Sequence, residues 1–496
     1  MVNIIVHDIL FQDRLYLAPP FSFLQIVEYD VVNKGNQDAS YFLVPVHASK
    51  SKNLALVEGV FISDSKNLIV SQVSLDDKSA SFIPENTKIF RVDLLTPLSP
   101  QASTRIRVTT SFTHTLTPFP ASIAQSDSQL IMYHDFTSVY ALHPVSSQST
   151  IIKLFPGKLE SYIPTKHSSR SSNSIIYGPF EYTMAPLTTG EAVAIHYENN
   201  FPFATMKTAS REFQISHWGQ VTVMENYELA HTGAKLKGEF IRANYESHIP
   251  AARGLASFEH LSMVLPLSAT DIFFRDAIGN VSTSHVRKEP RNKRTHVDII
   301  PRFPLFGGWS ADLEIGYGLP VEDTLTQVPN TDDLVLEVPF GLPFDSVAAD
   351  ELAVRVVLPE GAENIRYQLP FEVDQVVMDS MMTYLDTTGR PVLEFKKVNV
   401  VAGHWQPFRV AYTFKRVHLL REPGLIIGAL FGFFALVMVY ARVDLSLGSN
   451  GAEEEEDVKS VNGDKVVEKK QEKEEKEVAK SENAPAQGKK GDKKKK

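Results

Sequence analysis

Residues 104–112 read TRIRVTTSF, and this stretch decides the fold class of the chain. Ile106 and Val108 alternate with Arg105 and Arg107, so apolar and polar side chains fall on opposite sides of an extended backbone. A period of two residues is typical of an antiparallel strand that buries one face and exposes the other. The stretch therefore predicts a β-rich fold.

The same alternation returns at residues 408–414, near the other end of the body of the chain. Dense turn signals lie between such runs, at Asn33–Asn36, Pro359–Gly361 and Thr387–Pro391. Helical candidates in the body are few and short. We expect two β-sandwich-like domains in tandem, residues 21–214 and 215–415, with the boundary near Ser210–Gly219.

The composition limits the classes of function. Of the 496 residues, 43% are hydrophobic, so most of the chain can fold around apolar cores. The absence of cysteine excludes disulfide scaffolds, cysteine-ligated zinc, iron–sulfur clusters and thiol nucleophiles. The net charge of −9 argues against binding to nucleic acid, which normally needs a basic face. The last 46 residues hold 13 Lys and 13 Asp or Glu, so this tail should stay solvated and disordered.

Residues 424–441, GLIIGALFGFFALVMVYA, form an uncharged apolar run. As a helix the run is roughly 27 Å long, close to the thin hydrocarbon core of an endoplasmic reticulum bilayer. A buried helix of a soluble protein is the alternative, but an apolar run of this length between charged residues favours a membrane span. Gly424, Gly428 and Gly432 recur at four-residue spacing, as in a helix-packing face, although glycines also occur in spans by chance.

Charges near the run do not decide its orientation. Lys415, Arg416 and Arg421 precede it, whereas Arg442 is the one nearby base that follows it. Two other signals place the body in the lumen of the endoplasmic reticulum and the tail, 442–496, in the cytosol.

The first signal is the single Asn-x-Ser/Thr sequon, which lies in the body and makes Asn280 a candidate N-glycosylation site. The second is the carboxyl end, where Lys493 and Lys494 stand fourth and third from the last residue. That is the pattern of a cytosolic dilysine signal for retrieval to the endoplasmic reticulum.

Residues 1–20 do not form a clean signal peptide, because His7, Asp8 and Arg14 interrupt the apolar stretch. A lumenal body needs a signal for translocation, so this segment is uncertain. Either the signal peptide is absent and the single span acts as the anchor in an unusual way, or the true amino terminus is missing from this sequence, and we favour the second explanation.

No motif for a phosphate loop, a nucleophile elbow, a His-Glu-x-x-His zinc helix or a dinucleotide fingerprint occurs. His217 and His404, each beside a tryptophan, are expected to be packed or surface residues rather than ligands. The pair Asp332 and Asp333 is interpreted as part of a loop, with metal-dependent sugar transfer as the alternative. The basic run 287–294 is interpreted as a solvated hairpin tip, with an acidic partner or lipid headgroups as the alternative. We expect no catalytic residue, cofactor site or metal site.

Six strings in the body carry a family resemblance. They are His217–Gly219, His231–Gly238, Phe274–Ser284, Arg302–Trp309, Leu358–Ala362 and Tyr384–Val392. In this order they resemble the ribophorin I family of oligosaccharyltransferase subunits. The resemblance runs from about Phe21 to the membrane segment and is strongest over residues 177–415.

This resemblance implies a single-span type I protein of the endoplasmic reticulum membrane with two lumenal β domains. It implies a non-catalytic accessory subunit, which supports complex assembly and acceptor presentation. The complex transfers a preassembled oligosaccharide from dolichyl diphosphate to Asn of Asn-X-Ser/Thr in nascent polypeptides. The implied partners are the other subunits, including a multi-span catalytic one, nascent polypeptides and the membrane, with the translocon as a further candidate. The short tail makes direct ribosome docking unexpected.

Two other classes of protein remain as alternatives. A single-span receptor or adhesion protein with β domains would normally contain cysteines and a longer span, and both are missing here. An enzyme on a β scaffold would need an acid–base or metal site, which the sequence does not assemble.

Overall fold

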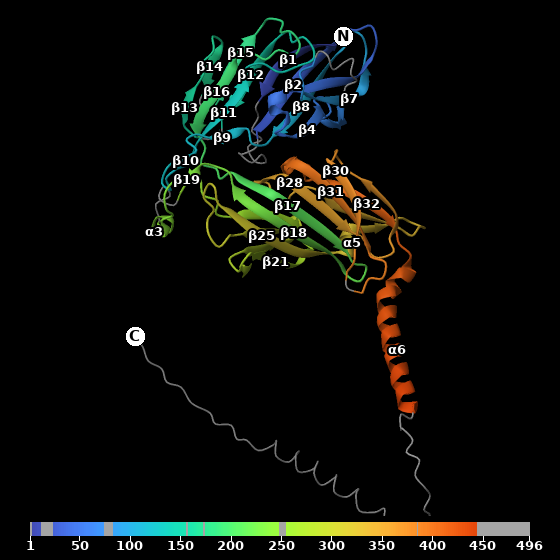
Figure 1. Ribbon diagram of the computed structural model, residues 1–496. Helices are drawn as coiled ribbons and strands as arrows, with labels where there is room; N and C mark the ends of the chain where they lie inside the picture. The colour runs from blue at the N-terminus through green and yellow to red at the C-terminus, as the bar shows by residue number, and fades with distance from the viewer. Residues whose placement is uncertain are drawn as a thin grey trace, which may run out of the picture. The chain divides into compact units, whose positions relative to one another are not determined.

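The computed structural model describes residues 2–10, 23–73, 83–154, 157–171, 174–247, 254–383 and 385–443, although of 2–10 only the backbone. Most of the uncertain segment 1–20 and almost all of the tail, with Lys493 and Lys494, lie outside the described residues. The chain divides into two compact units, Met1–Gly428 and Ala429–Lys496. All of the strands in the described part of the chain belong to the first unit (Figure 1).

The amino-terminal half is built from one large sheet and two smaller ones. The large sheet has the order β14 (Ser168–Ser171), β15 (Ser174–Phe180), β12 (Gln148–Lys153), β1 (Val2–Leu10), β2 (Phe23–Asn33), β8 (Ser103–Phe112), β4 (Leu54–Phe61), β5 (Lys66–Leu68). One smaller sheet has four strands in the order β13 (Leu159–Tyr162), β16 (Ala192–Glu198), β11 (Leu130–Phe136), β9 (Leu116–Pro118). The other has three strands in the order β3 (Ala39–Val46), β7 (Lys88–Leu98), β6 (Val70–Val73). Helix α1 is Ala48–Ser51.

The carboxyl-terminal half repeats this plan with a second large sheet. Its order is β22 (Gly279–Asn280), β21 (Thr270–Asp276), β25 (Ser310–Pro320), β18 (Gln220–His231), β17 (Ala204–Ile215), β28 (Ala348–Val357), β31 (Arg390–Val400), β30 (Gln375–Met381). One smaller sheet has three strands in the order β20 (Leu261–Pro266), β24 (Arg294–Ile299), β23 (His285–Glu289). The other has four strands in the order β26 (Leu325–Gln327), β27 (Asp333–Pro339), β32 (Pro407–Thr413), β29 (Glu363–Gln368). Short helical turns are α3 (Arg242–Tyr245), α5 (Val321–Thr324), η1 (Pro290–Asn292) and η2 (Ala402–His404).

Strand β8 confirms the alternation on which the fold class rested. Ile106 and Val108 are 0% and 1% exposed, whereas Arg107 lies on the opposite face and pairs with Glu28 of β2. In β32, Phe408 and the apolar residues that alternate with it are likewise buried. The prediction of a mainly β fold with one carboxyl-terminal apolar helix is confirmed.

The change from one set of sheets to the next lies at residues 199–203, between β16 and β17. Strand β17 pairs with β18 over almost its whole length, from Ala204 with His231 to Ile215 with Val221. The predicted boundary near Ser210–Gly219 therefore lies at the turn of a hairpin whose two strands belong to the second large sheet. Strand β1 likewise brings part of segment 1–20 into the first sheet, where it pairs with β2 and β12.

Helix α6, Arg421–Arg442, follows β32 after one turn, η3 (Arg416–Leu420). Among the described residues it is the one helix long and apolar enough to cross a membrane. Its side chains are exposed, as expected for a helix that would contact lipid or other helices. The two halves are also joined by a short parallel pairing of β10 (Ser122–Ile123) with β19 (Lys235–Leu236), which consists of two residue pairs.

Candidate assembly site at the start of helix α6

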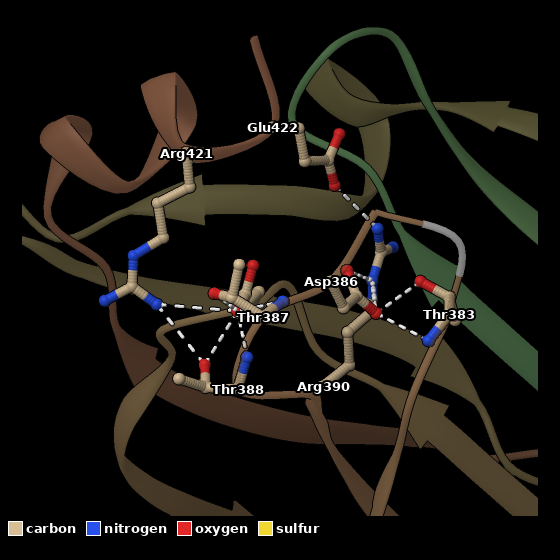
Figure 2. Close-up of polar contacts among 8 residues, drawn as sticks. Thr383, Asp386, Thr387, Thr388, Arg390, Arg421 and Glu422 are labelled. Carbon is tan, nitrogen blue, oxygen red and sulfur yellow. Dashed lines mark hydrogen bonds and ion pairs between the residues drawn. The ribbon is translucent and has the colours of Figure 1, made fainter. Parts of the chain in front are cut away.

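Two of the six family strings, Leu358–Ala362 and Tyr384–Val392, come together beside the first turn of helix α6. Tyr384 itself is outside the described residues. Both segments are turns at the ends of strands of the second large sheet, β28 and β31. We call the set Glu360, Asp386, Arg390, Arg421 and Glu422 the junction (Figure 2).

Glu360 is the hydrogen-bond acceptor at the centre of the junction. Its Oε1 accepts from the backbone N–H groups of Thr387 and Thr388 at 2.9 and 2.6 Å, and from their hydroxyls at 2.6 and 2.7 Å. The Arg421 Nη1 lies 3.8 Å from the same oxygen. Burial alone would raise the pKa of this carboxyl, but these hydrogen bonds stabilise the charged form and lower the pKa to about 2.

Arg390 joins the same turn to the helix by ion pairs. Its Nη2 donates to Glu422 at 2.8 Å, and its Nε lies 3.1 Å from Asp386, whose side chain is fully buried. Asp386 also accepts from the backbone N–H of Thr383 at 2.7 Å, which closes the turn. Figure 2 shows Arg421 and Glu422, from the start of α6, pointing toward the turn that carries Thr388 and Arg390.

Ring packing continues the junction to a third family string. The ring of His217, in the β17–β18 turn, lies 4.3 Å from the ring of Phe414, which lies 5.8 Å from His418 in η3. Gly361 allows His418 this close, because a Cβ on Gly361 would lie 1.9 Å from the His418 Nδ1. Gly361 also has a φ of +87°, which glycine adopts without strain.

The chemistry of the junction is that of a structural connection. Each of its three carboxylates accepts from arginine, hydroxyl or backbone donors, although the Oε2 of Glu360 is buried without a hydrogen-bond partner. Among the described residues, no group of three or more His, Asp or Glu is arranged to hold a metal ion. What the arrangement can do is fix the first turn of α6 against the second large sheet.

A second feature is an open groove of about 1000 Å³ along strands of the second large sheet. Among the charged residues of its described lining, acidic ones outnumber basic ones, and they include Glu228, Asp312, Glu351 and Asp374. Asp374 pairs with Lys397 at 3.6 Å, whereas Asp312 and Glu351 have no ion-pair partner in the described part of the chain. The groove therefore presents negative charge on an open surface that also includes apolar side chains.

The residues singled out in the sequence lie at separate places. Asn280 is exposed at the β21–β22 turn, where its Oδ1 accepts from Arg275 at 3.0 Å. Asp333 accepts from Thr413 at 2.6 Å and pairs with Arg366, so it serves the sheet rather than an open site. His404 is buried against Phe371.

The remaining sequence features also have simple positions. The basic run 287–294 forms the β23–β24 hairpin with η1 at its tip. A Cβ on Gly424, Gly428 or Gly432 would meet nothing within 4 Å, so these glycines are not needed for packing within this chain. The sequence gives no signal for the Arg390–Glu422 pair, because 32 positions separate the two residues and no local pattern relates them.

Comparisons with known proteins agree on one family. The family model described as Ribophorin I matches residues 23–441. The chain is 38% identical over 423 residues to dolichyl-diphosphooligosaccharide–protein glycosyltransferase subunit 1B of Arabidopsis thaliana, covering 84% of this chain and 89% of that protein. It is 36% identical over 430 residues to subunit 1 of Caenorhabditis elegans, covering 86% of this chain and 71% of that protein.

Likeness to solved structures is weak. An M1 zinc metallopeptidase from Deinococcus radiodurans covers 42% of each chain at 10% identity with a TM-score of 0.25. A score that low carries no inference about this chain.

Proposed function

The chain belongs to the ribophorin I family, and on this premise we propose that it is a non-catalytic accessory subunit of the oligosaccharyltransferase complex. The complex transfers a preassembled oligosaccharide from dolichyl diphosphate to Asn of Asn-X-Ser/Thr in nascent polypeptides. In this proposal the chain supports assembly of the complex and holds acceptor polypeptides near the catalytic, multi-span subunit.

The observation that carries the assembly role is the junction. Arg390 and Glu360, from two family strings, both engage the first turn of the apolar helix through Glu422 and Arg421. Strand β32 ends at Thr413 and α6 begins at Arg421, so little chain separates the β body from the span. A body held this close to its helix suits a subunit that must present a fixed surface to membrane-embedded partners.

The acceptor-holding role is supported by the open groove. An extended polypeptide can lie along an open groove of this kind, and the lining side chains would contact it because the strands beneath are already paired with one another. The exposed carboxylates of Asp312 and Glu351 would favour acceptor segments with basic residues.

For the topology, we propose that the body is lumenal and that the tail is cytosolic. The exposed Asn280, in its sequon, supports a lumenal body because glycosylation takes place there. Whether Asn280 carries a glycan is read from a shift in gel mobility after treatment with an endoglycosidase.

The assembly role is tested by affinity purification of the tagged full chain from microsomes. Arg390→Met removes the charge that faces Asp386 and Glu422, and we expect several-fold less of the other subunits to co-purify. The matched control is Arg409→Met, which removes an exposed pair with Glu337 at 2.8 Å on another sheet. Equal recovery for the two variants would contradict the role of the junction.

The acceptor role has a separate readout. Asp312→Lys combined with Glu351→Lys should lower glycosylation of reporter sequons flanked by basic residues and leave co-purification unchanged. Glu239→Lys, at an exposed position outside the groove, is the control. The non-catalytic assignment fails if the purified chain alone transfers oligosaccharide to an acceptor peptide.

A further inference from the structure

Large apolar side chains are exposed around the start of helix α6. Val417 and Leu420, in η3, are 76% and 64% exposed, Trp218 is 64% exposed and Met382 is 63% exposed. We call these four residues the junction rim. Large apolar residues that gather on one part of a surface usually mark a contact with a protein or a membrane.

Contacts of neighbouring residues connect the segments that carry this rim to the junction. Trp218 follows His217, whose ring packs on Phe414, which in turn packs on His418 of η3. Met382 lies close to Gly389, since its sulfur is 3.0 Å from the position that a Cβ on Gly389 would take. Gly389 follows Thr388, whose hydroxyl accepts a hydrogen bond from Arg421. The segments that carry the rim residues therefore lie near the turn from which α6 begins.

The position of the rim along the chain indicates what covers it. Leu420 precedes Gly424 by four residues, which is about 6 Å along a helix axis. The headgroup layer on each side of a bilayer is roughly 5–8 Å thick. If residues 424–441 span the hydrocarbon core, Leu420 must lie in or beside the headgroups, and its exposed neighbours are close to the same layer.

The chemistry of the rim also fits a lipid surface. Tryptophan is enriched at the boundary between headgroups and acyl chains, where its ring is amphipathic. Arg416 is exposed beside Val417 and has no ion-pair partner in the described part of the chain, so its guanidinium is available to a lipid phosphate.

We propose that the junction rim inserts into the headgroup–acyl boundary of the phospholipid bilayer, so that the body rests on the membrane at the β17–β18 turn and the β30–β31 connection as well as at its helix. The partner is the phospholipid surface itself, which is continuous with the lipid around α6. This inference rests on the membrane span of the proposed function and adds a second, peripheral membrane contact to it.

The absence of cysteine in the chain makes a direct test possible. Trp218→Cys, Met382→Cys and Leu420→Cys each introduce one reactive thiol at an exposed position, which should not disturb folding. Ile278→Cys, at a position 79% exposed on the β21–β22 turn, is the control. Each full-length variant is labelled with a fluorophore, reconstituted in phosphatidylcholine nanodiscs, and exposed in turn to a headgroup-spin-labelled lipid and to iodide.

We expect the lipid quencher to reduce emission at all three rim positions at least several-fold more than at Ile278→Cys, with iodide showing the reverse order. If Leu420→Cys is quenched by lipid while Trp218→Cys and Met382→Cys behave as Ile278→Cys does, the inference is wrong and the span stands. If Leu420→Cys also escapes the lipid quencher, the proposed membrane anchoring fails with it. Protection of Trp218→Cys and Met382→Cys from both quenchers would mean that protein covers the rim, which also overturns the inference.

Discussion

The Glu360 carboxylate shows how one side chain can organise a turn and a helix together. It is 6% exposed, yet it remains charged because four donors from Thr387 and Thr388 converge on one oxygen, with Arg421 nearby. Hydrogen bonds to a charged acceptor are about twice as strong as neutral ones. The charge on Glu360 therefore stabilises the junction more than its neutral amide counterpart would.

Replacing Glu360 by Gln should destabilise the full chain by about 1–3 kcal/mol at neutral pH, because the neutral amide oxygen is a weaker acceptor for the four donors than the carboxylate is. Thermal unfolding measured by intrinsic fluorescence tests this change. Glu363→Gln, which loses an exposed pair with Lys415, should shift the midpoint little. Equal shifts for the two variants would contradict the central role of Glu360.

The pH dependence gives a second check on the same residue. The pKa of Glu360 is lowered from 4.5 to about 2, so the folded state holds its carboxylate charged where the unfolded chain is protonated. Its stabilising contribution is present above pH 4.5 and is lost as the pH falls toward 2. The stability difference between the native chain and Glu360→Gln should shrink over that range, and a constant difference would argue against the assignment.

Among the elements, helix α6 and the strands could be predicted from the sequence, because each has a local pattern. The alternation in β8 and the uncharged run 424–441 depend only on neighbouring residues. The junction depends on the contact of Glu360 with Arg421 and on that of Arg390 with Glu422, and the two residues of each pair are far apart in the sequence. Their segments were recognisable as turns, but nothing local shows that the two turns meet.

The division into halves illustrates the same limit. A turn at residues 216–219 followed by a new strand has the same sequence appearance whether it separates two domains or closes a hairpin. Pairing of Ala204 with His231 and of Ile215 with Val221 shows the hairpin, and this register is set by side chains elsewhere in the sheet. Strand boundaries could thus be read locally, whereas membership in a sheet could not.

The glycines of α6 carry a prediction about assembly. Changing Gly424, Gly428 and Gly432 to Leu fills space that is empty in this chain, since a Cβ at each position meets nothing within 4 Å. The variant should fold normally, and several-fold less of the partner subunits should co-purify if these positions allow close helix packing.

The control for this variant is Leu430→Phe, which adds bulk about 200° around the helix from Gly428. It should leave co-purification near the native level. Unchanged recovery with the triple Leu variant would show that the glycines are incidental.

Over the whole body, the two halves are connected by buried backbone contacts rather than by a bare linker. The family strings His231–Gly238 and Arg302–Trp309 lie together, with the His231 N–H donating to the Trp309 carbonyl at 2.9 Å. The same segment reaches the other half, where the Ala234 N–H donates to Gln129 Oε1 at 2.9 Å. Gln129 is fully buried and also donates to the Asn199 carbonyl. These contacts couple the packing of one half to that of the other.

Gly307 is the position at which this coupling can be tested, because a Cβ there would lie 1.9 Å from the Ala234 carbonyl oxygen. Gly307→Ala must push residue 234 away and weaken its hydrogen bond to Gln129, a cost of about 1–3 kcal/mol for a buried polar group left unpaired. If the halves unfold together, calorimetry of the full chain should show one transition in the native protein and a lower midpoint, with broadening or splitting, in the variant.

Gly219→Ala, in a turn with nothing within 4 Å of its Cβ position, should leave the transition unchanged. Two separate transitions already present in the native chain would show that the halves unfold independently and that the contacts at Gln129 are not enough to couple them.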